Sequence, residues 1–196
     1  MGYGAFTYTY YFERLRMSTA ESNRSLLVLL FTVLLTGIFI GGCSSKESPR
    51  YVNKDKKFSM QFPEKWERQE DYLGTAVIAL RPGEGANDKF RENVNVVMET
   101  VPANLDVDHY LMISKRNMGK FLTNFQQVDS GQTTIDKHDT KWMVYTHHLG
   151  HLDLKVLAYT LLRDDRAYTI RCSSTPEQFT AYRSKFEEIA GTFRFE

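Results

Sequence analysis

The hydrophobic and polar positions of this chain separate one continuous apolar segment from a longer part in which apolar and polar residues alternate. The continuous segment covers residues 26–40 and carries no charge. From Tyr51 to the C-terminus, apolar residues recur at the spacings typical of strands and helices in a packed domain. The pattern therefore predicts a membrane-directed leader followed by one folded domain over residues 51–196.

Strands are predicted where apolar residues alternate between turn-forming segments. Phe58, Met60 and Phe62 point to one face of a strand, and the charged turn 54–57 joins that strand to residues 51–53 in a hairpin. Further strands are predicted at residues 76–80, 92–101, 141–149, 152–163 and 167–172. The strand 152–163 is apolar on both faces, which predicts a sheet that is covered on both sides.

Two helices are predicted, and the first begins at Asp106 or Asp108 and ends near Asn124. An aspartate at this position caps the free N–H groups of the first turn and suits the helix dipole. The predicted buried stripe of this helix consists of Leu111, Ser114, Met118, Phe121, Leu122 and Phe125.

The last helix begins with a capping sequence, in which Thr175 is the N-cap, Pro176 the first helical residue and Gln178 the capping-box partner. Its inward stripe is predicted to be Phe179, Tyr182, Phe186 and Ile189. Gly191 ends the helix, and residues 192–195 are predicted to add an edge strand. The predicted fold class is α+β, with an antiparallel β-sheet sandwiched by helices in an α/β/α arrangement.

The apolar segment 26–40 is shorter than the roughly 20 residues that a spanning helix needs, but it has the length of a secretory signal core. Arg24 precedes it, and Gly41-Gly42-Cys43 follows it. This arrangement resembles the lipobox of bacterial lipoproteins. The resemblance implies cleavage before Cys43, a thioether-linked diacylglycerol with palmitate-type chains on its sulfur, and an acyl group on the new amino terminus. We therefore expect a signal peptide at 1–42 and a lipidated cysteine with a polar tether at 43–50.

An uncleaved signal anchor is the alternative, because residues 25–45 carry no charge at all. Either way the folded part is expected outside the cytoplasm, on the periplasmic or extracytoplasmic side of the cell envelope. By the same resemblance, Ser44 after the cysteine permits sorting to the outer membrane in a Gram-negative host. Residues 1–16 are rich in Tyr and Phe and include Glu13, so we expect translation to begin at Met17.

The charges of the folded part are balanced. The chain has 25 Lys and Arg and 24 Asp and Glu, of which three basic and two acidic residues precede Cys43. A neutral domain without a basic stripe argues against nucleic acid as a partner. No glycine-rich loop joins a strand to a helix, so we expect no nucleotide either. Cys172 alternates with Tyr168 and Ile170 and is predicted to be an inert core thiol.

A histidine cluster is the sharpest candidate for chemistry. His147, His151 and Asp153 are the predicted ligands of a divalent metal such as zinc, which imidazole and carboxylate groups bind well. The metal assignment is weakened because His147 and His148 point to opposite faces of a strand. The alternative interpretation is that these histidines are solvated turn residues and that the protein binds no cofactor. Trp66 and Trp142 are predicted to pack in the core, and the loop 81–91 is either a recognition loop or a plain variable one.

The folded part also resembles PsbP-like domains, which include DcrB-like proteins. The likeness begins with Phe58-Ser59-Met60-Gln61-Phe62-Pro63 and Trp66, continues with the strand 92–97, and ends with the Thr-Pro-Glu start of the last helix. It covers residues 51–196. Members of this superfamily are mostly binding or assembly proteins without catalysis, so the resemblance implies a binding module and names no ligand.

We therefore expect a membrane-anchored extracytoplasmic lipoprotein that is not an enzyme. Its expected role is a non-catalytic binding or assembly accessory factor for an envelope or membrane protein complex, held at the membrane by its lipid. The alternative is a metal- or small-ligand-binding envelope protein, including a metal-dependent hydrolase, that uses the His147, His151 and Asp153 cluster. A third reading is an envelope-stress lipoprotein with no tight ligand.

Overall fold

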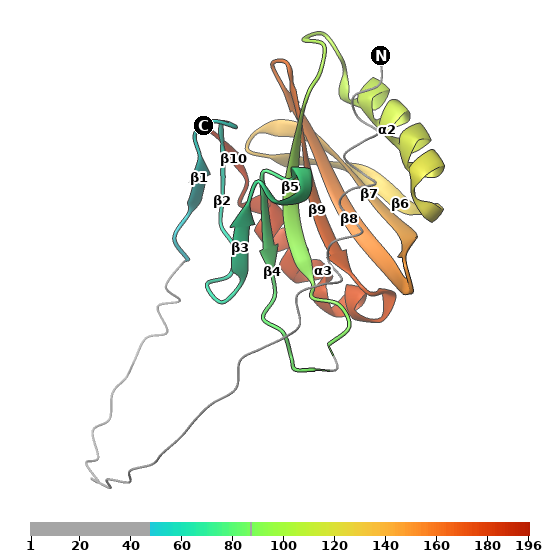
Figure 1. Cartoon of the computed structure of the whole chain (residues 1–196). Coiled ribbons are helices and arrows are strands. Elements are labelled where there is room, and N and C mark those ends of the chain that lie inside the picture. Colours follow the sequence, from blue (N-terminus) through green and yellow to red (C-terminus); the bar gives the residue numbers. More distant parts are fainter. Residues whose placement is uncertain (1–47, 87) are drawn as a thin grey trace, which may run out of the picture.

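A seven-stranded antiparallel sheet with one helix on each face forms the centre of the structure, a computed structural model that describes residues 48–86 and 88–196 (Figure 1). Its strands follow the order β3-β4-β5-β9-β8-β7-β6. They are β3 (Glu67–Glu70), β4 (Val77–Leu80), β5 (Asn93–Thr100), β6 (Thr123–Ile135), β7 (His138–Leu149), β8 (Leu152–Arg163) and β9 (Arg166–Ser174). The helices are α2 (Val107–Phe121) and α3 (Pro176–Gly191), and a short 3-10 turn, η2, covers Tyr72–Gly74.

A second, three-stranded sheet consists of β1 (Tyr51–Asn53), β2 (Phe58–Met60) and β10 (Arg194–Phe195). The predicted hairpin is confirmed, because Tyr51 pairs with Met60 and Asn53 with Phe58 in antiparallel register. The predicted last strand forms as well, but it pairs with β2 in this small sheet. The predicted signal peptide at 1–42 and Cys43 lie outside the described residues.

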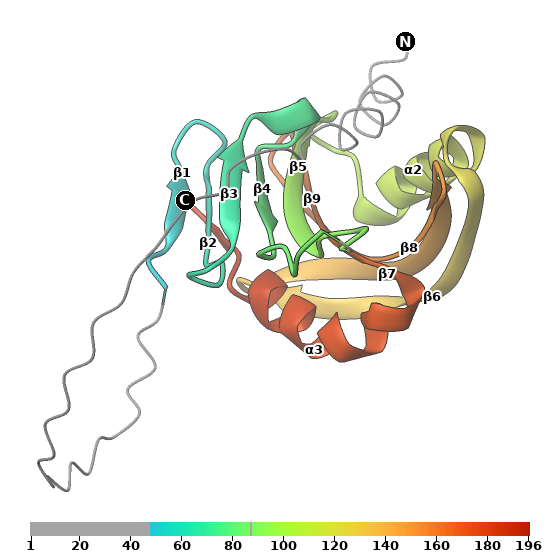
Figure 2. The same ribbon diagram turned by 60° about the horizontal axis from the view of Figure 1, so that its bottom comes forward.

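The two faces of β8 are buried in two different layers, as its sequence predicts. Leu157, Tyr159 and Leu161 belong to a core that α3 and the small sheet complete. Val156 and Ala158, on the opposite face, pack with α2. Figure 2 shows α3 and α2 on the two sides of the sheet. The α+β fold with helices on both faces of an antiparallel sheet is therefore confirmed.

Cys172 lies inside the larger core and is fully buried. Burial raises the pKa of its thiol far above the ordinary value, since a thiolate is poorly solvated there. The predicted core position of this thiol is confirmed. Among the described residues no helix has the length and apolarity to cross a membrane.

The helix starts agree with the sequence in position but differ in detail. Asp106 caps α2, and its carboxylate accepts a hydrogen bond of 2.8 Å from the His109 backbone N–H. Thr175 and Pro176 begin α3, but the Thr175 side chain makes no capping hydrogen bond, so the predicted capping box is wrong. Phe121, which belongs to the predicted buried stripe of α2, is 45% exposed, whereas Tyr110, which lies outside that predicted stripe, is buried. Phe121 is the last residue of the helix and is exposed, whereas Met118 and Leu122 on either side of it pack in the cluster on this face of the sheet.

The spacing of apolar residues in the sequence does not predict two of the strands, β3 and β6. β3 and β6 are the outermost strands of the large sheet, and their residues are mostly polar and exposed. Because the side chains of both strands are mostly exposed, their sequences carry no alternation of buried apolar residues. β6 forms because it pairs with β7 through a tight turn at Ile135 and His138.

Replacing Phe186 of α3 with alanine should lower the free energy of unfolding by about 3–5 kcal/mol, because a fully buried aromatic ring would leave a cavity. Phe121→Ala is the matched control at an exposed position and should change it by less than about 0.5 kcal/mol. Urea unfolding monitored by circular dichroism measures both. Equal losses for the two variants would contradict the assigned core.

Candidate functional site

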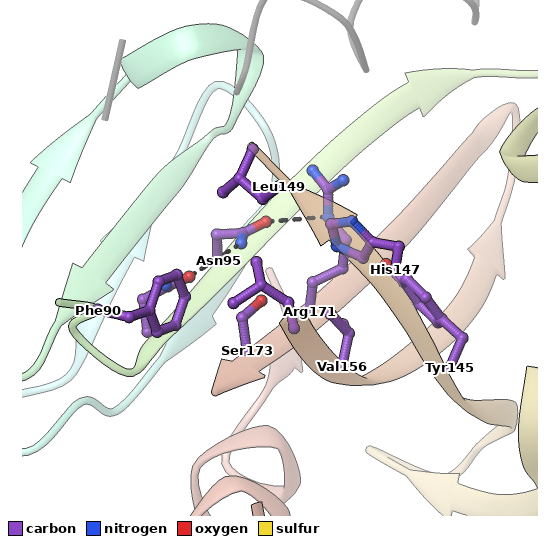
Figure 3. Close-up of a pocket in the computed structure, with 10 residues that line it drawn as sticks. Phe90, Asn95, Tyr145, His147, Leu149, Val156, Arg171 and Ser173 are labelled. Carbon is purple, nitrogen blue, oxygen red and sulfur yellow. Dashed lines mark hydrogen bonds between the residues drawn. The ribbon is translucent and has the colours of Figure 1, made fainter. Parts of the chain in front are cut away.

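The face of the sheet that carries α2 is only partly covered by that helix. Beyond α2, the strand pairing aligns polar side chains in cross-strand rows: Asn95 of β5 lies opposite Arg171 of β9, and Asn93 lies opposite Ser173. His147 of β7 lies next to this group and pairs with Leu154 of β8. These residues line one small pocket, shown in Figure 3.

A chain of hydrogen bonds fixes the polar wall of this pocket. The Arg171 Nε–H donates to Oδ1 of Asn95 over 3.1 Å, and the Asn95 amide donates to Oδ1 of Asn93 over 3.5 Å. Asn93 in turn donates to the backbone carbonyl of Arg91 over 3.1 Å. All three side chains are buried, so these bonds satisfy groups that would otherwise be costly to remove from water. The guanidinium is thereby held in one orientation.

His147 is also buried in this wall, with 3% of its surface exposed. Its Nδ1 lies 3.1 Å from the carbonyl oxygen of His148, which can only accept, so Nδ1 carries the hydrogen. Burial lowers the pKa of the imidazole below its usual 6.5, and the positive charge of Arg171 lowers it further, while the carbonyl bond acts in the opposite direction. These effects favour the neutral form of the imidazole.

The pocket has a volume of about 20 Å³, which is room for one water-sized group. Its described lining includes the apolar side chains of Phe90, Leu149 and Val156 and contains no carboxylate. The arrangement offers hydrogen-bonding groups to a single small polar moiety. It does not have the room to enclose a sugar or a nucleotide.

The structure does not bring the three predicted metal ligands together. His147 faces the pocket, whereas His148, one residue further along β7, lies on the opposite face, where its Nδ1 contacts a carboxylate oxygen of Asp153. His151 is exposed in the turn between β7 and β8. Within residues 48–86 and 88–196 no group of three or more His, Cys, Asp or Glu side chains can hold a metal ion. The two-residue period of the strands separates Asp153 from His147.

The loop 81–91, for which the sequence left a recognition loop or a plain variable loop open, is fixed at its base. Arg81 is buried and ion-pairs with Glu92, which is also buried, and with Asp88 over 3.0 Å. A buried guanidinium with two carboxylates holds both ends of the loop in place. The tryptophans behave as predicted, since Trp66 and Trp142 pack against the larger core.

Sequence reasoning missed the polar wall of the pocket. Asn93, Asn95 and Arg171 each alternate with valine, isoleucine or cysteine along a strand that is otherwise apolar. A repeated polar residue at every second position of a central strand marks one polar face, and this signal was present in residues 92–97.

The fold is that of PsbP-like proteins. No protein-family model matches the sequence, and no curated protein matches it either. Among solved structures, the cyanobacterial PsbP protein CyanoP of Synechocystis sp. PCC 6803 is similar over 80% of this chain and 99% of its own, with a TM-score of 0.58 and 14% identity.

Two further bacterial structures share this fold. LpqN of Mycobacterium tuberculosis, which is involved in cell envelope biogenesis, matches 70% of this chain and 82% of its own, with a TM-score of 0.56 and 11% identity. Protein PA94 of Pseudomonas aeruginosa matches 74% of this chain and 95% of its own, with a TM-score of 0.54 and 13% identity. At these identities the comparison establishes the fold alone.

The buried His147 should make the protein less stable as the pH falls below 6.5. In that range His147 of the unfolded chain binds a proton, whereas the buried imidazole of the folded protein does not. The free energy of unfolding therefore decreases with pH until the lowered pKa of the folded state is reached. His147→Gln should reduce this loss between pH 6.5 and 5, whereas the exposed His151→Gln should not. Urea midpoints at several pH values measure the effect, and identical pH profiles for wild type and His147→Gln would refute it.

Proposed function

We propose that this chain is a lipid-anchored protein of the bacterial cell envelope that acts as a non-catalytic binding or assembly accessory factor for a membrane protein complex. The anchor is Cys43, and the folded domain is the recognition body. Ser44 permits outer-membrane placement where the host is Gram-negative. The envelope role of LpqN, a protein of the same fold, agrees with this assignment.

The position of β1 is the observation that carries the proposal. Figures 1 and 2 place β1 at one end of the molecule and α2 at the other. The segment from Cys43 to Tyr51 spans at most about 28 Å when fully extended. A lipid on Cys43 would therefore keep Tyr51 of β1 within about 28 Å of the point of membrane attachment. Confinement to the surface raises the effective concentration of the domain toward membrane partners.

Acylation at Cys43 is tested by metabolic labelling with a clickable palmitate analogue in a bacterial host. We expect wild type to be labelled and to fractionate with membranes, and Cys43→Ser to lose both properties. Cys172→Ala is the matched control, because it removes the only other cysteine, and it should keep the label. An unlabelled wild-type protein that fractionates with the cytosol would disprove the proposal.

The accessory role is tested by in-cell cross-linking of the acylated protein, followed by identification of the cross-linked species. One membrane or envelope protein should be recovered reproducibly from wild type and lost from Cys43→Ser, because the unanchored variant is no longer concentrated at the membrane. Recovery of an equal yield from both variants would show that anchoring contributes nothing to recognition.

A further inference from the structure

The two edges of the large sheet differ in how well they are protected against pairing with another chain. β3 is four residues long and consists of Glu67, Arg68, Gln69 and Glu70, so charge and shortness both discourage a further strand. β6, at the other edge, has 13 residues, is largely exposed, and contains Asp129 as its only charged residue and no proline. The β6 edge therefore lacks protection by charge, proline or shortness.

The second half of β6 has regular strand geometry. Register shifts interrupt its pairing with β7 between Thr123 and Gln126 and between Gln127 and Asp129. From Asp129, opposite Val144, to Ile135, opposite His138, the pairing continues without a break. In the sheet that the described residues form, β6 is the terminal strand, so its outer edge pairs with no other strand there.

A groove of about 500 Å³ lies between α2 and this edge. Leu111 and Met112 of α2 and Met143 of β7 give it an apolar lining, and Met112 is 59% exposed. Exposed methionine at a groove is typical of surfaces that adapt to apolar side chains of a partner. The groove therefore adjoins the regular part of the β6 edge.

The charged groups of the groove are mainly basic. The Nζ atom of Lys141 in β7 lies 3.2 Å from Oδ1 of Asp108 in α2, so those two charges offset each other. Lys115 of α2 also lines the groove and makes no ion pair with any residue that the structure describes. Arg116 and Lys120 follow on the exposed surface of the same helix. The groove thus favours a ligand that carries a carboxylate.

We propose that the groove between α2 and β6 binds an extended segment of a partner protein, which adds as a further strand along residues 130–134 of β6. An apolar side chain of that segment lies against Met112 and Met143, and a carboxylate beside it lies near Lys115. This mode combines backbone hydrogen bonds, which give affinity, with side-chain contacts, which give specificity. The inference rests on the proposed function, since it names the chemistry of the partner.

A second copy of the chain is a poorer occupant. Pairing of Ser130 with Met143 and of Gln132 with Lys141 places these β6 side chains on the groove face of the sheet. Two copies joined edge to edge would offer serine and glutamine to an apolar groove and bring two Asp129 carboxylates to the same interface. Both effects disfavour the dimer, so the groove requires a segment of different composition.

The experiment uses the full chain, purified in detergent micelles, and fluorescein-labelled ten-residue peptides that alternate threonine with leucine or valine. One peptide ends in two glutamates and a second in two lysines. We expect the acidic peptide to bind with a Kd of about 10–100 μM, to bind at least tenfold more tightly than the basic one, and to weaken as salt is added. Fluorescence anisotropy measures the affinities.

Two variants separate the groove from general charge effects. Lys115→Glu should weaken the acidic peptide at least tenfold. Lys89→Glu makes the same charge change at an exposed position of the loop 81–91 and should alter the Kd less than twofold. Hydrogen exchange of the bound protein should show new protection within residues 130–134, which a merely electrostatic contact at α2 would not produce.

Three outcomes would overturn the inference. They are no binding by the acidic peptide at 1 mM, equal weakening by the two charge variants, and binding without new protection in residues 130–134. Sedimentation showing a dimer that Gln132→Pro dissociates would assign the edge to a second copy instead. None of these measurements depends on acylation, so a failure of the groove is distinguishable from a failure of the membrane anchor.

Discussion

The burial of β8 on both faces is the constraint on which the rest of the structure depends. Antiparallel sheets commonly leave one face to water, but Leu157 and Leu161 on one side of β8 and Val156 and Ala158 on the other all avoid it. The chain must therefore supply a covering layer for each face. α3, which follows β9 directly, joins the small sheet on one face, and α2, inserted between β5 and β6, packs on the other.

The limited length of α2 explains why both candidate binding regions lie on its side of the sheet. Where the helix does not reach, Asn95 and Arg171 must satisfy their own hydrogen-bonding groups, and they do so in the polar wall beside His147. Where the helix diverges from the edge of the sheet, it leaves the groove next to β6. One helix that covers part of a face thus leaves a small pocket with a polar wall and an open groove with an apolar lining.

Much of the fold could be predicted from the sequence because burial leaves a local period in it. The two apolar faces of β8, the β1–β2 hairpin, the cap at Asp106 and the Thr175-Pro176 start of α3 all follow from residues that are neighbours in the chain. The core position of Cys172 follows from the same alternation. For these elements the residues themselves carry the information, since each apolar position must face a covered side.

The remainder depends on contacts between distant segments. β6 has no apolar period and forms because β7 pairs with it. Phe121 is exposed at the end of α2, although its spacing predicts a buried position. Asn95 and Arg171 are 76 positions apart and meet only through the pairing of β5 with β9. The sequence by itself determined the covered faces and the helix starts. The pocket, the groove and the separation of His147 from Asp153 were decided by the tertiary structure, because strand order and register are set by non-local pairing.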